Sequence, residues 1–340
     1  MAAGTPLLSV RDLTVAFNTP DGLVQAVNGV SFDLHPGETL AVVGESGSGK
    51  SVSAMAVMQL LPHYTRITGS IEFDGRDLLS LSERQMRRLQ GNDIAMIFQD
   101  PMTALNPVFT VGDQLMEAIR IHHKDVSKRA ARGRVIGLLD LVGIPEPGIR
   151  IDNYPHEFSG GMRQRAMIAM AIANEPKLLI ADEPTTALDV TIQAQVMEVM
   201  RRAQEATGAA MMLITHDLGL VAGVAERIQV MYGGRLFETG DTDTIFYHSR
   251  NPYTQGLISS IPSATTRKEH RLRPIPGAPP SAITFPQGCV FRPRCPHATD
   301  ECRTEPDLVA LDFDRRHLSR CHYAESLPEL GVDDPVGSSA

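Results

Sequence analysis

Residues 44–51 read Gly44-Glu45-Ser46-Gly47-Ser48-Gly49-Lys50-Ser51, a complete match to the pattern G-x-x-x-x-G-K-[ST]. The apolar residues 39–43 before it predict a strand, and residues 51–61 after it predict a helix. In such a loop, backbone amides and the helix N-terminus surround phosphate, Lys50 reaches the β- and γ-phosphates, and the Ser51 hydroxyl ligates Mg²⁺. A glycine-rich turn with a chance lysine is the alternative, and the flanking strand and helix disfavour it.

The order of the apolar segments predicts an α/β fold with a mostly parallel sheet covered by helices. Residues 7–17 and 24–34 alternate apolar and polar side chains around a turn, which predicts an antiparallel subdomain before the loop. Residues from about 100 to 165 show helical patterns only and are expected to form a helical subdomain. The further strands are expected at residues 69–75, 94–98, 177–183, 209–216 and 227–238.

Composition narrows the class of protein. The 340 residues carry a net charge of −8 and include no long basic run, so no nucleic-acid partner is expected. The first residues lack the pattern of a signal peptide, and no apolar run approaches the roughly 20 residues of a membrane span. We therefore expect a soluble, cytoplasmic chain. The alternation of predicted strands and helices stops after about residue 255, which predicts a nucleotide-binding domain over 1–255 and an extension over 256–340.

The apolar strand 178–182 ends in two carboxylates, Asp182 and Glu183. A buried strand of this kind delivers Asp182 beside a phosphate loop, where it holds Mg²⁺ directly or through water. Glu183 is then placed to orient or deprotonate an attacking water.

Phe17, at the end of the first strand, is either a core aromatic or a platform on which adenine stacks.

A second glycine-rich helix entrance follows the helical segment. It reads Ser159-Gly160-Gly161-Met162-Arg163-Gln164-Arg165 and is too short to surround a phosphate alone. Its amides and the Ser159 hydroxyl suit a γ-phosphate presented by another subunit. A plain helix cap is the alternative.

Together these motifs resemble those of the nucleotide-binding subunits of ABC transporters, over residues 7 to about 240. The resemblance implies ATP hydrolysis by a head-to-tail dimer, in which each ATP lies between one phosphate loop and the other subunit's signature loop, here Ser159-Gly160-Gly161. It also implies that Gln99 senses Mg²⁺ and the γ-phosphate and that His216 contacts the γ-phosphate. Residues Ala187, Leu188 and Asp189 correspond to the loop that crosses the dimer. The signature differs from the commonest form at Phe158 and Met162.

The carboxy-terminal third sharpens this resemblance. Residues 251–254, 274–277 and 289–295 resemble the ATPase subunits of dipeptide and oligopeptide importers. The resemblance implies a second, homologous ATPase subunit, two transmembrane permease subunits and an extracytoplasmic binding protein, with this subunit peripheral on the cytoplasmic face of the membrane. Nickel, glutathione and antimicrobial-peptide systems share the pattern and remain alternatives. The ATPase subunit of an exporter is a further alternative, and the carboxy-terminal extension disfavours it.

All four cysteines lie in the extension, with the spacing Cys289-x₅-Cys295-x₆-Cys302-x₁₈-Cys321. This wide spacing suits a [4Fe–4S] cluster, and the peptide-importer resemblance implies the same group. A zinc ion held by four thiolates and a set of buried structural thiols are the alternatives. The expected role of the cluster is to hold together a segment too small for its own core, with a redox-sensing role also open.

Overall fold

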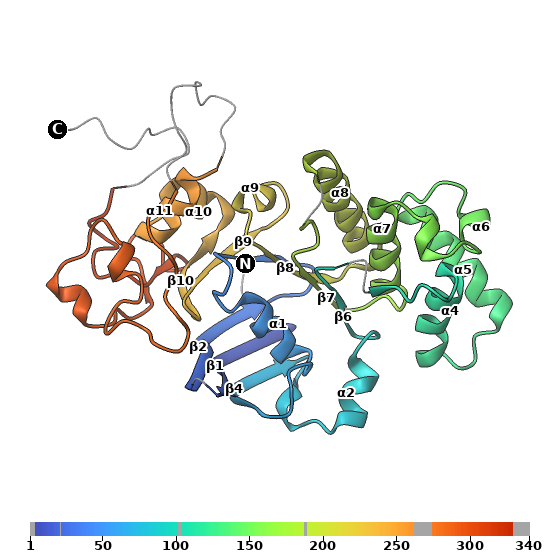
Figure 1. Ribbon diagram of the computed structural model, residues 1–340, viewed down its shortest axis with the longest axis horizontal. Coiled ribbons are helices and arrows are strands. Elements are labelled where there is room, and N and C mark those ends of the chain that lie inside the picture. The colour runs from blue at the N-terminus through green and yellow to red at the C-terminus, as the bar shows by residue number, and fades with distance from the viewer. Residues whose placement is uncertain (1–3, 21, 101–103, 187–188, 262–273, 329–340) are drawn as a thin grey trace. The chain divides into compact units, whose positions relative to one another are not determined.

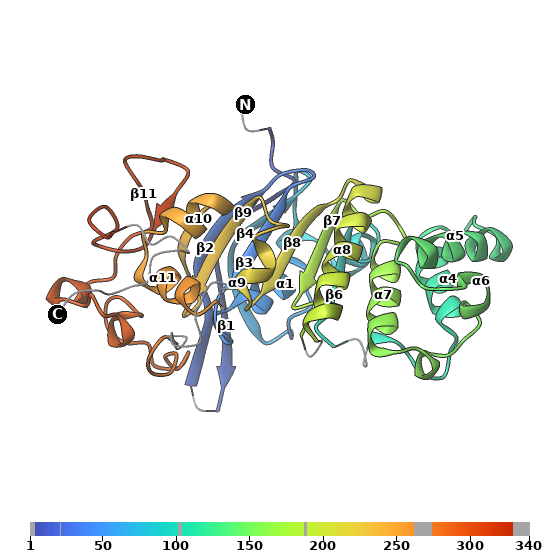
Figure 2. The ribbon, with the colours of Figure 1, turned by 90° about the horizontal axis from the view of Figure 1, so that it is seen from above.

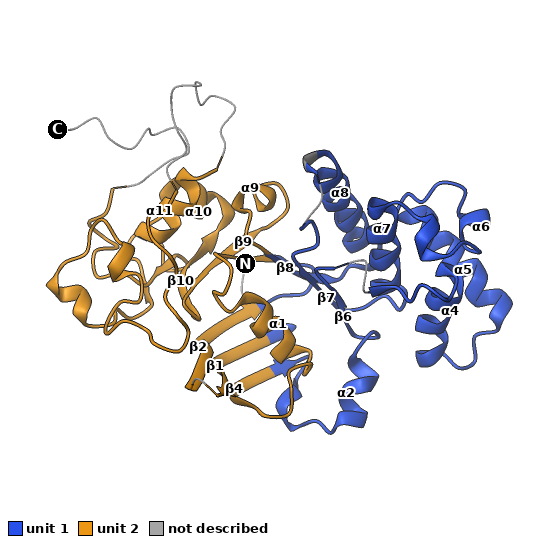
Figure 3. Ribbon diagram, in the orientation of Figure 1, with its two compact units in different colours: residues 1–8, 34–39, 72–214 blue, residues 9–33, 40–71, 215–340 orange. Residues whose placement is uncertain are grey.

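The computed structural model describes every residue except 1–3, 21, 101–103, 187–188, 262–273 and 329–340. The chain divides into two compact units, one of residues 1–8, 34–39 and 72–214 and the other of residues 9–33, 40–71 and 215–340 (Figure 3). The predicted boundary at residue 255 does not coincide with this grouping and stays a prediction. Along the described parts of the chain, no helix is both long and apolar enough to cross a bilayer.

The first unit contains three neighbouring parallel strands, β6 (Ile94–Ile97), β7 (Leu178–Asp182) and β8 (Ala210–Thr215). Every residue of these strands is buried, as expected where parallel strands are covered on both faces. The helices α4 to α7 gather together, which agrees with the helical subdomain expected from the sequence (Figure 2). The other bounds are β5 (Arg76–Asp77), α2 (Glu83–Leu89), α4 (Val111–His122), α5 (Lys128–Leu141), α6 (Pro147–Arg150), α7 (Gly160–Ala171) and α8 (Val190–Thr207).

The second unit begins with the long strand β1 (Leu8–Thr19), which lies between β2 (Gly22–Leu34) and β4 (Thr65–Phe73) in one sheet (Figure 1). A second sheet contains β3 (Thr39–Val43), which pairs in parallel with β9 (Arg227–Tyr232). The helices are α1 (Lys50–Val57), α9 (Leu218–Val221), α10 (Thr242–His248) and α11 (Pro252–Ser259).

The segment predicted as one strand over residues 227–238 is a hairpin. Strand β10 (Arg235–Asp241) runs antiparallel to β9 and is joined to it by Gly233 and Gly234, which both have positive φ. Glycine adopts this conformation without the steric cost that a side chain would bring, and a two-residue turn of this kind closes a hairpin.

The extension continues this sheet. Its strand β12 (Leu318–Ser319) pairs antiparallel with β10, and β11 (Val309–Ala310) pairs with β12. Strand β12 therefore covers the edge of β10 and pairs backbone groups that would otherwise be open to pairing with another chain.

Candidate functional site

The phosphate loop is a tight turn between the buried strand β3 and helix α1. Gly44 has φ +150°, and a Cβ at this position would lie 2.1 Å from the backbone oxygen of Met231. Gly49 has φ +100°, and its Cβ would lie 2.4 Å from the backbone oxygen of Ala26. Neighbouring backbone thus approaches the loop so closely that only glycine fits at these two positions.

Lys50 lies inside this loop and is only 4% exposed. Its Nζ donates hydrogen bonds to the backbone oxygens of Gly44 at 2.7 Å and Glu45 at 3.0 Å, and lies 3.5 Å from Ser48 Oγ. Ser51 follows in the first turn of α1 and is half-buried, while Ser46 and Gly47 are exposed. The loop therefore encloses a positive charge beside a helix N-terminus, which is the arrangement that binds polyphosphate.

The two carboxylates occupy different surroundings at the end of β7. Asp182 is the last residue of the strand and is 4% exposed, whereas Glu183 is half-buried. Glu183 has φ +47°, a conformation that is strained for a residue with a side chain, and its backbone N–H donates to Ile214 O at 2.9 Å. Strain of this kind is typical of functional sites, where surrounding contacts hold it.

Gln99 and Thr186 both contact Glu183. The Gln99 side-chain amide donates to Glu183 Oε2 at 3.1 Å, and the Thr186 hydroxyl donates to the same oxygen at 2.8 Å. Strands β6 and β7 are parallel neighbours, so the residues after each strand meet at one edge of the sheet. The structure therefore brings together two of the residues predicted from the sequence. Thr186 carries no motif that would have identified it.

The signature loop caps its own helix. Ser159 Oγ accepts a hydrogen bond from the backbone N–H of Met162 at 3.3 Å, and Ser159 and Gly160 are exposed at the start of α7. Asp189 is the cap of α8, where its Oδ1 accepts from the N–H of Ile192 at 3.0 Å. Residues 187 and 188, predicted to cross the dimer, lie outside the described residues.

The remaining predicted residues lie in the same unit as the phosphate loop. Phe17 is half-buried in β1, and His216 is exposed directly after β8. Gln99, Ser159, Gly160, Gly161, Asp182, Glu183 and Asp189 belong to the other unit.

Two protein families match this chain. Residues 27–186 match the family described as ABC transporter, and residues 237–302 match the family described as oligopeptide/dipeptide transporter, C-terminal region. Dipeptide transport ATP-binding protein DppD of Escherichia coli is 51% identical over 318 residues, which cover 93% of this chain and 96% of that protein. This chain belongs to the family of ATP-binding proteins of oligopeptide and dipeptide ABC transporters.

Two other relatives are also more than half identical to this chain. DppD of Bacillus subtilis is 55% identical over 298 residues, covering 87% of this chain and 88% of that protein. Oligopeptide transport ATP-binding protein OppD of Mycobacterium tuberculosis is 53% identical over 313 residues, and the match covers 92% of this chain. The chain spans about half, 51%, of the length of that mycobacterial relative.

Solved structures confirm the predicted ABC cassette fold. A dimeric ATP-binding cassette in a post-hydrolysis state, bound to ADP and Pi, aligns with a TM-score of 0.62 at 24% identity, covering 69% of this chain and 98% of that one. The protein cbiO1 of Clostridium perfringens, part of an ABC transporter complex, aligns with a TM-score of 0.61 at 27% identity, covering 71% of this chain and 91% of that one.

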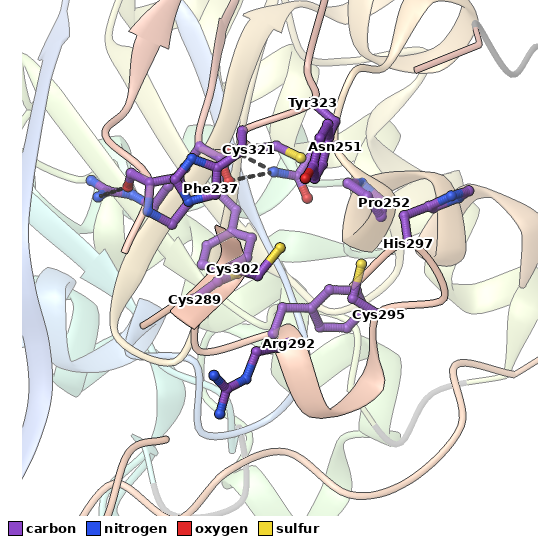
Figure 4. A pocket seen from close by; sticks show the side chains of 14 residues that line it. Phe237, Asn251, Pro252, Cys289, Arg292, Cys295, His297, Cys302, Cys321 and Tyr323 are labelled. Carbon is purple, nitrogen blue, oxygen red and sulfur yellow. Dashed lines mark hydrogen bonds between the residues drawn. The ribbon is translucent and has the colours of Figure 1, made fainter. Parts of the chain in front are cut away.

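The four cysteines of this chain line one pocket, to which Phe237, Asn251 and Pro252 also contribute (Figure 4). All four are free thiols. Burial raises the pKa of the Cys289 thiol above its ordinary value, that of Cys295 to about 11 and that of Cys321 to about 12. These thiols are therefore protonated at neutral pH.

The predicted [4Fe–4S] cluster on Cys289, Cys295, Cys302 and Cys321 is wrong. Among the described residues, which include all four, no group of three or more His, Cys, Asp or Glu side chains is arranged to hold a metal ion. The pocket between the thiols has a water-accessible volume of about 20 Å³, which is space for roughly one water molecule. The zinc alternative fails on the same finding. The spacing indicated that the four cysteines share one segment, but it did not reveal that Cys302 is buried and the other three are half-buried.

Proposed function

We propose that this chain is the ATP-hydrolysing subunit that powers the import of dipeptides or oligopeptides through a membrane ABC transporter. The observation that carries the proposal is the joining, in one chain, of a phosphate-loop cassette and the carboxy-terminal region of oligopeptide/dipeptide transporters. The cassette accounts for the chemistry, and the carboxy-terminal region accounts for the class of solute.

The phosphate loop fits the polyphosphate of ATP. The close backbone around Gly44 and Gly49 leaves a cradle that a Cβ would fill, and Lys50 is the buried cation within it. ATP supplies the phosphoanhydride bond, and Mg²⁺ neutralises its charge. We assign Lys50 to the phosphates, the oxygens of Ser51, Gln99 and Asp182 to Mg²⁺, and Phe17 to adenine. The assignment of these ligands rests on their oxygen chemistry and on the order of the motifs.

Glu183 has the chemistry of a general base in this scheme. Gln99 and Thr186 donate to Oε2, so they fix the orientation of the carboxylate group, which in this role accepts the proton of a water. We assign the γ-phosphate contacts to His216 and to Ser159, Gly160 and Gly161 of the partner subunit's equivalent loop, with Asp189 at the crossing. Ser159 and Gly160 are exposed, as a loop that meets another subunit requires.

The partners follow from this role. We propose a heterodimer with a second, homologous ATPase subunit, docked on two permease subunits that receive peptide from an extracytoplasmic binding protein. The chain would then lie on the cytoplasmic face of the membrane. Two exposed apolar residues after β6, Val108 and Phe109, are 70% and 54% exposed and support a docking surface in this segment.

Reconstitution tests this function. The chain is purified together with the proteins that accompany it and placed in proteoliposomes, and ATP hydrolysis is measured with and without a mixture of dipeptides and oligopeptides. Peptide-stimulated hydrolysis and uptake of labelled peptide support the proposal. Stimulation by nickel or by glutathione, with no response to peptides, would assign a different solute to the same ATPase.

A further inference from the structure

The extension contacts the phosphate loop through an ion pair whose arginine is buried. Arg294, at the end of a short 3₁₀ turn (Arg292–Arg294), donates from Nη1 to Glu45 Oε2 at 2.6 Å and from Nη2 to Glu45 Oε1 at 2.9 Å. Glu45 is the residue that follows Gly44 in the loop. The two residues are 249 positions apart in the chain and belong to the same compact unit. The contact is bidentate, the geometry that makes an arginine–carboxylate pair strong and directional.

Arg294 is fully engaged in this position. Its side chain is 5% exposed and that of Glu45 is 26% exposed. Beyond Glu45, its nitrogens donate to Pro276 O at 2.8 Å, Ile275 O at 3.3 Å and Tyr232 Oη at 3.2 Å. Besides Glu45, the guanidinium is therefore held by the backbone oxygens of Ile275 and Pro276 and by the hydroxyl of Tyr232, the last residue of β9. A charge this buried tolerates the loss of its partner poorly.

Glu45 is also held on its backbone. Its N–H donates to Tyr253 Oη at 2.9 Å, and its carbonyl accepts from Lys50 Nζ at 3.0 Å. The Tyr253 ring packs against Tyr232 and Phe291, with ring centroids 4.6 Å and 5.3 Å apart. Glu45 thus lies between the lysine of the loop and an aromatic cluster to which the extension contributes Phe291.

We propose that Arg294 is a positioning residue for nucleotide binding: through Glu45 it holds the phosphate loop in its binding conformation. This inference rests on the proposed function, since it assumes that the loop binds ATP. A loop held in advance loses less conformational freedom when it binds phosphate, so its affinity is higher. Nucleotide affinity then depends on whether the extension is folded and seated on the loop.

The test compares the full-length chain with Arg294→Ala by calorimetric titration with MgATP and with MgADP. We expect Arg294→Ala to raise both dissociation constants by about tenfold, the effect of one lost ordering contact. Both nucleotides are affected because the loop surrounds the β-phosphate, which ADP also carries. Arg294→Lys keeps the charge but loses the two-pronged contact, so it should give an intermediate increase.

The matched control is Arg320→Ala. Arg320 is another largely buried arginine of the extension, and it donates to Leu236 O at 2.9 Å and Pro306 O at 3.0 Å instead of to the loop. If Arg320→Ala lowers the melting temperature as much as Arg294→Ala yet keeps the wild-type affinity, the effect of Arg294 is specific to the loop. An equal loss of affinity in both variants would overturn the proposal in favour of general destabilisation.

A double-mutant cycle with Glu45→Ala tests whether Arg294 affects nucleotide affinity through Glu45. If Arg294 acts through Glu45, the double variant binds nucleotide no more weakly than the weaker single variant. Additive losses, or a wild-type affinity in Arg294→Ala, refute the proposal. If Arg294→Ala does not fold, Arg294→Lys and Glu45→Ala supply the same cycle. A wild-type chain that binds neither nucleotide contradicts the proposed function itself, an outcome distinct from failure of the Arg294 contact.

Discussion

Replacing Glu183 by glutamine tests the assigned base with little change in shape. Glutamine keeps the length of the side chain and an oxygen that accepts from Gln99 and Thr186, which lie at 3.1 Å and 2.8 Å. It loses the charge and the capacity to take a proton. General-base catalysis contributes about 10²- to 10⁴-fold, so we expect turnover to fall at least about 10²-fold, which is about 2.7 kcal/mol in activation free energy.

The assay is steady-state phosphate release by the assembled transporter, with nucleotide binding to the same preparation measured alongside. Affinity for MgATP should stay within about twofold of the wild type. Glu175→Gln is the matched control, because Glu175 also has positive φ, at +54°, and its exposed carboxylate lies 3.9 Å from Arg134. Hydrolysis by Glu183→Gln at the wild-type rate would refute the role assigned to this carboxylate.

Three further predictions address binding, docking and the thiols. Lys50→Ala removes the buried cation of the loop, so MgATP affinity in calorimetric titration should fall more than tenfold. Phe109→Ser should lower peptide-stimulated hydrolysis in proteoliposomes while leaving MgATP affinity unchanged, because the 54% exposed ring is assigned to docking. The pKa values of Cys295 and Cys321 are raised by burial to about 11 and about 12, so the folded state holds these protons more tightly than the unfolded chain. The stability they contribute is complete below pH 9 and is lost as pH rises from about 9 to about 12, which melting curves across that range measure.

Local patterns were sufficient for the parts of the site that are local. The phosphate loop, the strand that ends at Asp182 and the helix after Ser159 each occupy a short stretch in which glycine, apolar runs and capping residues determine the backbone. Errors arose at the ends of elements. Helix α1 ends at Val57 rather than near residue 61, because Gln59 takes φ +49° and turns the chain.

Contacts between distant residues could not be predicted in this way. The pair of Gly233 and Gly234 is a hairpin signal that the long apolar run around it concealed. Nothing near Glu45 in the sequence indicates Arg294, because the pairing depends on how the extension is seated. The cysteine spacing likewise indicated that the thiols share one region, but not how their side chains are arranged, and among the described residues that arrangement forms no group suited to hold a metal ion.

The extension is held to the cassette by buried polar contacts that a separately folded appendage would not need. His317 and Glu238 are both fully buried, with Nε2 and Oε1 2.7 Å apart, where β12 pairs with β10. Strand β10 begins beside Gly234, whose N–H donates to Ser48 O of the phosphate loop at 3.1 Å. Two contacts thus hold the loop: the hydrogen bond from the hairpin to Ser48 and the ion pair between Arg294 and Glu45. Since Arg294 belongs to the extension and the hairpin strand β10 pairs with the extension's β12, we expect the free energy that holds the loop to be coupled to the free energy that folds the extension.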